Sequence, residues 1–264
     1  SYNIAYQLFV IGSMENGFIP PTETQLYGDP EINILPNLQL DPEKNVNYNL
    51  GFRWAPSDKG RHKVSLYASA FWRNGFDKIT RQVVDETEVQ SEEDADIQTT
   101  RFVNLGKTQA KGVEAEILYV YNNRLNAAFN FSKFNNLFKG GNDIAGEAHD
   151  LYDQQVPNEP FFTINANVQY RLNDIFQKRS ILNLYYNTGY VGEYYIVWGQ
   201  PEWSKTPAQF THDIGASYRL PNGKLVVSVD VKNMFNAEVY DNFMVQKPGR
   251  GIYFKLNYTL SKFL

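Results

Sequence analysis

Segments in which apolar and polar residues alternate follow one another along the whole chain. In residues 45–54, Val46, Tyr48 and Leu50 alternate with asparagine and glycine. Because successive side chains of a strand point to opposite faces, a period of two predicts strands with one apolar and one polar face. The pattern occurs in ten segments, which are 2–10, 45–54, 64–72, 113–121, 125–131, 163–171, 182–190, 210–218, 225–232 and 252–260.

The composition favours strands and excludes several kinds of protein. Aromatic residues make up 15% of the chain and are more common in strands than in helices. The net charge of −4 gives no general attraction for nucleic acid. With no cysteine, the chain has no disulfide, thiolate metal site or cysteine nucleophile. No stretch approaches the roughly 18 apolar residues of a membrane-spanning helix, so strands must make any membrane crossing.

The ten segments are joined by connections of two lengths. The short connections are 56–60, 122–124, 172–179 and 220–223. The long connections are 11–43, 74–111, 135–160, 192–208 and 234–250. Strict alternation of the two is typical of outer-membrane barrels, which have short periplasmic turns and long extracellular loops. We therefore predict an all-β fold, an antiparallel transmembrane β-barrel wall whose last strand descends and leaves Leu264 in the periplasm.

A soluble β-sandwich that acts as a binding module is the alternative fold. Its strands also alternate, but they average about five to six residues, whereas membrane-crossing strands and these segments have about nine to eleven. Aromatic residues give a second test, because they gather where the apolar band of a barrel meets the lipid headgroups. Five aromatics lie on apolar faces near the predicted periplasmic ends, namely Trp54, Tyr121, Tyr170, Tyr218 and Tyr258. Their common position favours the membrane barrel. The alternative is that these aromatics cap the core of a soluble protein.

The histidines show no catalytic or metal-binding pattern. His62, His149 and His212 are scattered along the chain and lack paired ligand spacing. His212 and Asp213 are neighbours on a strand, so their side chains point to opposite faces and cannot form a dyad by adjacency. We therefore expect no catalytic residue, no metal site and no cofactor.

One long connection is strongly acidic. It holds seven carboxylates and no lysine or arginine, at Asp85, Glu86, Glu88, Glu92, Glu93, Asp94 and Asp96. The spacing of a glycine-turned calcium loop is missing. A solvated extracellular loop is the favoured interpretation, and a site for Ca²⁺ or a cationic ligand is the alternative.

Several motifs occur in a fixed order along the chain. They are Asn-Gly-Phe-Ile-Pro-Pro-Thr at 16–22, Leu-Asp-Pro-Glu-Lys at 40–44, Asn-Leu-Gly-Lys at 104–107, Lys-Gly-Val-Glu-Ala-Glu at 111–116, Val-Lys-Asn-Met-Phe-Asn at 231–236 and Pro-Gly-Arg at 248–250. In order and spacing they resemble the C-terminal part of a TonB-dependent outer-membrane receptor. The sequence departs from the family pattern at Ile19, where the family has arginine, and at Asn49, where it has glutamate.

This resemblance implies a barrel of about 22 strands closed around an N-terminal plug. Residues 1–264 would then be the C-terminal portion of the barrel, with about ten strands. The plug, through which TonB acts, and the remaining strands lie outside this chain. Because unpaired strand edges are prohibitive in lipid, upstream sequence or a second chain must supply the missing strands.

The resemblance also implies a function. It indicates a receptor and active transporter in the outer membrane of a Gram-negative bacterium, which takes up a nutrient through the plugged barrel with energy from the TonB system. Iron chelates, cobalamin, sugars and peptides all remain open as the nutrient. The alternative is a self-contained ten-stranded outer-membrane barrel that acts as an adhesin, small porin or surface enzyme.

Two sets of residues are candidates for the transport path. Polar faces predict a hydrated lumen, and we expect its side chains to contact water, a plug or one another in preference to substrate. These lumen-facing candidates are Asn45, Asn47, Glu114, Glu116, Asn165 and Asn167. Aromatics of a long extracellular connection are the ligand-binding candidates, either stacking on a ligand or, equally, packing the loop. They are Tyr194, Tyr195, Trp198 and Trp203.

Overall fold

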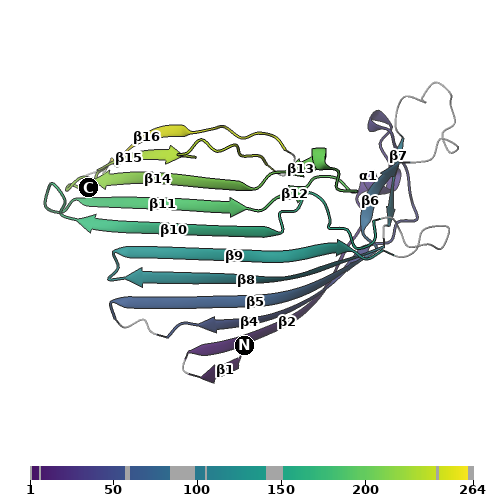
Figure 1. Ribbon diagram of the computed structural model, residues 1–264, viewed down its shortest axis with the longest axis horizontal. Helices are drawn as coiled ribbons and strands as arrows, with labels where there is room; N and C mark the ends of the chain where they lie inside the picture. Colours follow the sequence, from purple (N-terminus) through teal and green to yellow (C-terminus); the bar gives the residue numbers. More distant parts are fainter. Residues whose placement is uncertain are drawn as a thin grey trace.

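The computed structural model describes residues 2–5, 7–56, 60–83, 99–104, 106–140, 151–241 and 244–260. Its main feature is one antiparallel sheet of eleven strands in the order β1-β2-β4-β5-β8-β9-β10-β11-β14-β15-β16 (Figure 1). The strands are β1 (Tyr2–Ala5), β2 (Leu8–Ile19), β4 (Glu43–Trp54), β5 (His62–Phe76), β8 (Lys107–Tyr121), β9 (Leu125–Phe138), β10 (Phe162–Asn173), β11 (Ile181–Val191), β14 (Gln209–Arg219), β15 (Leu225–Lys232) and β16 (Gly251–Tyr258). Each neighbour along the sheet is also the next long strand along the chain, as the sequence predicts.

The first predicted strand is wrong in its bounds. Strand β1 and the start of β2 form a hairpin, in which Tyr2 lies opposite Val10. Gln7 in this turn has φ 55°, a left-handed conformation outside the range of a regular strand. Both arms of a tight hairpin keep the same alternation, so the pattern alone does not reveal the turn. Strand β2 then extends to Ile19. It includes residues 12–17, where glycine and asparagine interrupt the alternation of apolar and polar residues.

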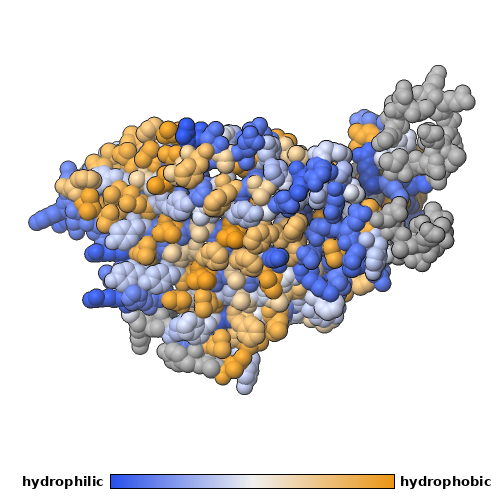
Figure 2. All heavy atoms as spheres, viewed as in Figure 1, coloured by the Kyte–Doolittle hydropathy of each residue, from blue (hydrophilic) through white to orange (hydrophobic). Residues whose placement is uncertain are grey.

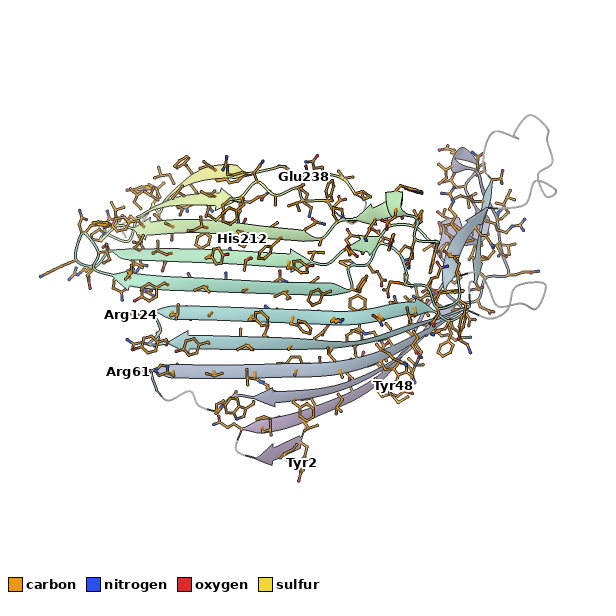
Figure 3. All side chains as sticks on the ribbon, viewed as in Figure 1. Tyr2, Tyr48, Arg61, Arg124, His212 and Glu238 are labelled. Atoms are coloured by element: carbon orange, nitrogen blue, oxygen red, sulfur yellow. The ribbon has the colours of Figure 1, made fainter. Side chains whose placement is uncertain are left out.

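The short connections all lie at one end of the sheet and the long ones at the other (Figure 1). Arg61 and Arg124 mark the end with the short turns, which we call the turn end (Figure 3). The turn between β8 and β9 consists of Asn122, Asn123 and Arg124, and its two asparagines have φ 49° and 53°. Asparagine tolerates this left-handed conformation better than most residues do.

The two faces of the sheet differ in polarity along its full width. Asn47 and Asn49 lie on one face, while Tyr48 and Leu50 lie on the other, and the cross-strand register extends this division from strand to strand. On the apolar face Leu50 remains 51% exposed. Figure 2 shows apolar side chains over the body of the sheet and hydrophilic ones towards both ends. A face of this kind suits contact with lipid, and we call it the outward face.

The five aromatics at the turn end lie on the outward face, as predicted. Trp54 and Tyr121 are the last residues of β4 and β8. Tyr170 lies opposite Leu125 and Leu184. Tyr218 is opposite Val227, and Tyr258 is opposite Leu225. The row therefore follows one end of the sheet from β4 to β16.

The sheet is open. Within the residues that the structure describes, β1 pairs only with β2 and β16 only with β15, so the barrel is not closed. No described helix has the length and apolar character needed to cross a membrane. The last predicted residue of the barrel wall, Leu264, lies outside the described residues.

The long connections contain small elements of their own at the end opposite the turns, which we call the loop end. A three-stranded sheet combines β3 (Ile34–Leu35), β6 (Ile79–Val83) and β7 (Thr100–Asn104). A second pairs β12 (Tyr194–Tyr195) with β13 (Lys205–Thr206). Short helices are α1 (Glu23–Tyr27), η1 (Pro30–Ile32) and η4 (Glu202–Ser204), and Thr22 with Gln25 forms a capping box at the start of α1.

Candidate functional site

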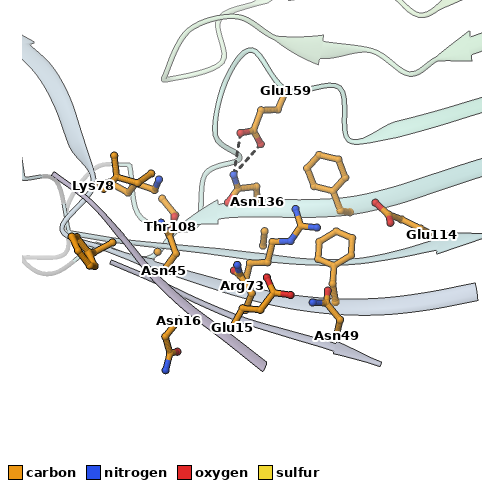
Figure 4. Close-up of a pocket in the computed structure, with 18 residues that line it drawn as sticks. Glu15, Asn16, Asn45, Asn49, Arg73, Lys78, Thr108, Glu114, Asn136 and Glu159 are labelled. Carbon is orange, nitrogen blue, oxygen red and sulfur yellow. Dashed lines mark hydrogen bonds between the residues drawn. The ribbon is translucent and has the colours of Figure 1, made fainter. Parts of the chain in front are cut away.

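A pocket of about 590 Å³ opens on the polar face near the loop end of β2, β4, β5, β8 and β9 (Figure 4). The period of two directs alternate side chains of each strand into it. Its polar lining includes Glu15, Asn45, Asn47, Asn49, Arg73 and Glu114. Donors and acceptors of both charge signs therefore converge on one space.

The structure places all six lumen-facing candidates on the polar face. Asn45, Asn47 and Glu114 line the pocket. Glu116 shares the face of Glu114 but lies two residues closer to the turn end. On β10, Asn165 and Asn167 share the polar face, and the Asn167 amide donates to the side-chain oxygen of Asn187. Their role in a lumen remains a prediction.

Arg73 is a pocket residue that sequence reasoning missed. Its guanidinium carbon lies 4.3 Å from the centre of the Phe71 ring, and that ring packs against Phe134 at 6.2 Å. Gly112 makes room for the two rings, because a Cβ there would lie 2.4 Å from Cβ of Phe134 and 2.6 Å from Cζ of Phe71. The aromatic floor therefore positions a permanently charged group in the pocket.

A carboxylate of the β9–β10 connection forms part of the pocket wall. The side-chain amide of Asn136 donates to both oxygens of Glu159, at 3.2 and 2.9 Å. Burial raises the pKa of Glu159, while the bond from Asn136 and the charge of Lys78 act in the lowering direction. Lys78 itself donates to Glu43 at 2.7 Å. This chain of contacts ties β4, β9 and the β9–β10 connection together at the loop end.

The four aromatic ligand candidates do not form one cluster. Tyr194 is only 3% exposed and donates to the carbonyl of Asp241 at 3.1 Å. Trp198 packs edge-on against buried Phe138, with ring centres 5.8 Å apart. Both positions agree with the loop-packing alternative.

The other two aromatics differ in accessibility. Tyr195 pairs with Lys205, whose ammonium lies 5.9 Å from the tyrosine ring. Trp203, in η4, is 72% exposed and is therefore the most available of the four for stacking on a ligand. A ligand-binding role for this set remains a prediction.

The histidines that the structure describes, His62 and His212, lie against aromatic side chains. On the outward face, the rings of Phe210 and Phe235 meet His212 edge-on at 4.2 and 4.9 Å, and the Tyr186 hydroxyl bonds to Nδ1. Asp213 points the other way and accepts from Lys232 at 2.8 Å. The side chains of His212 and Asp213 therefore point to opposite faces, as the alternation along the strand predicts.

No group of three or more potential metal ligands occurs in the described ranges. His149 and the acidic segment from Asp85 to Asp96 lie outside those ranges. The expectation of a solvated acidic loop therefore remains a prediction.

The chain matches the family model described as "TonB dependent receptor-like, beta-barrel" over residues 1–234. A comparison with curated proteins finds no match. Among solved structures, the chain is similar to the ferric enterobactin receptor PfeA of Pseudomonas aeruginosa, with 16% identity, a TM-score of 0.70 and coverage of 97% of this chain and 39% of that one.

Two further structures have the same fold over nearly the whole chain. The siderophore receptor PirA of Acinetobacter baumannii has 17% identity and a TM-score of 0.68, and the chain covers 39% of it while 97% of the chain is matched. The FrpB iron transporter of Neisseria meningitidis has 18% identity and a TM-score of 0.67, with coverage of 97% and 38%. The chain thus spans less than two fifths of each of these three proteins.

Proposed function

Since the chain belongs to the TonB-dependent receptor family of β-barrels, we propose that it forms part of an outer-membrane transporter that takes up a nutrient with energy supplied through TonB. This family consists of receptors and transporters of the Gram-negative outer membrane and not of enzymes. The proposal concerns the whole protein, of which this chain supplies eleven neighbouring strands. The remaining strands and the plug come from outside the chain.

The observation that carries the proposal is the family match over most of a sheet whose two faces differ in polarity. An apolar outward face suits lipid, and the opposite face suits a hydrated lumen. In this arrangement the loop end is extracellular and the turn end periplasmic, so the described part of β16 ends on the periplasmic side. Residues 1–264 then form a C-terminal portion of the barrel.

An iron chelate is the ligand class that we propose. PfeA and PirA are named as receptors for a ferric chelate and a siderophore, and FrpB as an iron transporter. The pocket adds a chemical argument, because beside the carboxylates of Glu15 and Glu114 it presents the positive charge of Arg73 and the neutral donors of Asn45, Asn47 and Asn49. Such groups suit the oxygen-rich surface of an anionic chelate. Ligand captured by the loops would enter the lumen beside this pocket when the plug rearranges.

Uptake of radiolabelled ferric enterobactin tests the function. The full-length protein is expressed in cells that lack other receptors for this chelate, and uptake is compared with and without a protonophore. We expect uptake above the empty-vector level that depends on TonB and disappears with the protonophore. If ferric enterobactin is not taken up, a panel of other ferric chelates, cobalamin, sugars and peptides is tested. Failure of the whole panel at normal outer-membrane abundance would refute the transporter.

A further inference from the structure

The charged residues on the outward face all have the same sign and all lie towards the loop end. Along the eleven strands, every charged side chain that the described register assigns to this face is a lysine. They are Lys44, Lys107, Lys111 and Lys133. The polar face, in contrast, carries both signs on the same strands, for example Glu15, Arg73 and Glu114.

Lys111 and Lys133 form the centre of this basic group. Lys111 lies opposite Asn135, and Lys133 lies opposite Val113, so the two lysines are diagonal neighbours on β8 and β9. Both are exposed. Among the described residues neither forms an ion pair. Like charges this close repel each other, and an anion between them would remove the repulsion.

The side chains around the lysines have the character of a lipid–water boundary. The ammonium of Lys111 lies 4.3 Å from the centre of the Trp72 ring. Trp72 donates its indole N–H to Asn74 at 2.9 Å, and Gln109 donates to the same Asn74 oxygen at 3.1 Å. A tryptophan with one apolar and one hydrogen-bonded side is typical of the headgroup region.

A shallow hollow of about 710 Å³ lies in the outward face directly beside the lysines. Its lining crosses β2, β4, β5, β8 and β9 and includes Gly12, Tyr48, Leu50, Ala70 and Val113 together with Lys111 and Lys133. Small residues at Gly12 and Ala70 make the depression. An apolar hollow next to an unpaired positive pair matches one kind of molecule, an amphiphile with an acyl chain and an anionic headgroup.

We propose that this surface binds a phosphorylated glycolipid of the outer leaflet, with a phosphate at Lys111 and Lys133 and an acyl chain in the hollow. The assignment to the outer leaflet rests on the proposed function, which makes the loop end extracellular. In the Gram-negative outer membrane that leaflet is built from a phosphorylated glycolipid, lipid A with its attached sugars. Charge complementarity and the hollow at the lysine end of the face together support this occupant.

Native mass spectrometry of the full-length protein tests the proposal. The protein is stripped of lipid in detergent and titrated with lipid A carrying two phosphates, with dephosphorylated lipid A and with inorganic phosphate alone. We expect tightest binding of the phosphorylated lipid, weaker binding of its dephosphorylated form and none of inorganic phosphate. Equal binding of the two lipids would overturn phosphate recognition, and binding of inorganic phosphate would overturn the need for a lipid.

Variants locate the site. Lys111→Gln and Lys133→Gln are each expected to weaken lipid A binding about fivefold, and the double variant more than either. Lys63→Gln, a lysine of β5 on the polar face at the turn end, is the matched control and should bind like the parent. Ala70→Trp fills the hollow without changing charge and should also weaken binding. Unchanged binding by the double variant would mean that the lysines only extend towards water, which would overturn the proposal.

Two readouts separate this proposal from the proposed function. Outer-membrane fractionation and ferric chelate uptake are measured for the parent and the double variant. Loss of lipid A binding with retained uptake supports the lipid site alone. A parent protein that reaches the outer membrane and binds lipid A but takes up no member of the nutrient panel would refute the transporter and leave the lipid site intact.

Discussion

The ring of Tyr185 on β11 lies over Gly215 on β14, its direct cross-strand partner, so closely that a Cβ on Gly215 would be 2.2 Å from the tyrosine Oη. Both residues are on the polar face. Since real side-chain atoms do not approach this closely, the ring occupies the space that the glycine leaves open.

The first prediction is that Gly215→Ala destabilises the sheet by about 1–3 kcal/mol, because the tyrosine must leave its position. Gly17→Ala is the matched control, since a Cβ at Gly17 meets nothing within 4 Å. That control is expected to be neutral or slightly stabilising. Urea unfolding of the full-length protein in detergent measures both free energies, and equal values for the two variants would contradict the packing argument.

The second prediction concerns Arg73. Arg73→Gln should weaken ferric chelate binding roughly tenfold, as expected for the loss of one charge-assisted hydrogen bond. Arg53→Gln on β4 shares the polar face but lies at the turn end, far from the pocket, and should bind normally. Equilibrium binding to purified protein gives the comparison. Equal weakening by both variants would mean that the overall charge of the polar face, and not the pocket, determines binding.

The third prediction separates the loop tryptophans. Trp203→Ala should reduce chelate uptake without lowering barrel abundance, because Trp203 is 72% exposed and supports no described core. Trp198→Ala removes the contact with buried Phe138 and should also lower resistance of the loop to limited proteolysis. Unchanged uptake by the Trp203 variant at equal abundance would count against its role in ligand capture.

The fourth prediction is a dependence of stability on pH. Burial raises the pKa of Glu159 above its ordinary value of 4.5, so the folded protein holds this proton more tightly than the unfolded chain. The resulting stabilisation is complete below the ordinary value and is lost as the pH rises through the raised one. Glu159→Gln is neutral at every pH and should show a smaller stability difference between about pH 4 and about pH 7. Thermal unfolding at both pH values measures it, and an unchanged difference would exclude Glu159 as the source.

The sheet could be predicted from the sequence because membrane strands repeat one simple rule. Each strand sorts its side chains by polarity at every second residue, and the register between strands preserves that sorting, as Leu50 opposite Ala70 illustrates. The rule predicts nothing about segments in which polarity does not alternate. The β1–β2 turn at Gln7 is missed because the alternation continues on both sides of it. The loop strands β6 and β7 are missed because they pair through contacts between residues distant in sequence.

The pocket could be predicted only in part. Asn45 and Asn47 lie in a segment with strong alternation, so their face was clear from the sequence. Arg73 and Glu15 lie beyond the apolar alternation, in strand extensions towards the loop end. The folding of Tyr194 and Trp198 into the loop interior depends on Asp241 and Phe138, partners that no local pattern identifies.

The aromatic floor of the pocket has a spectroscopic consequence. Gly112 lies beneath the rings of Phe71 and Phe134, so the magnetic field of their π electrons should shift its α-proton resonances away from those of the other strand glycines. A chelate that draws Arg73 off the Phe71 ring would move those resonances. One glycine signal can thus report occupancy of the pocket without any label on the ligand.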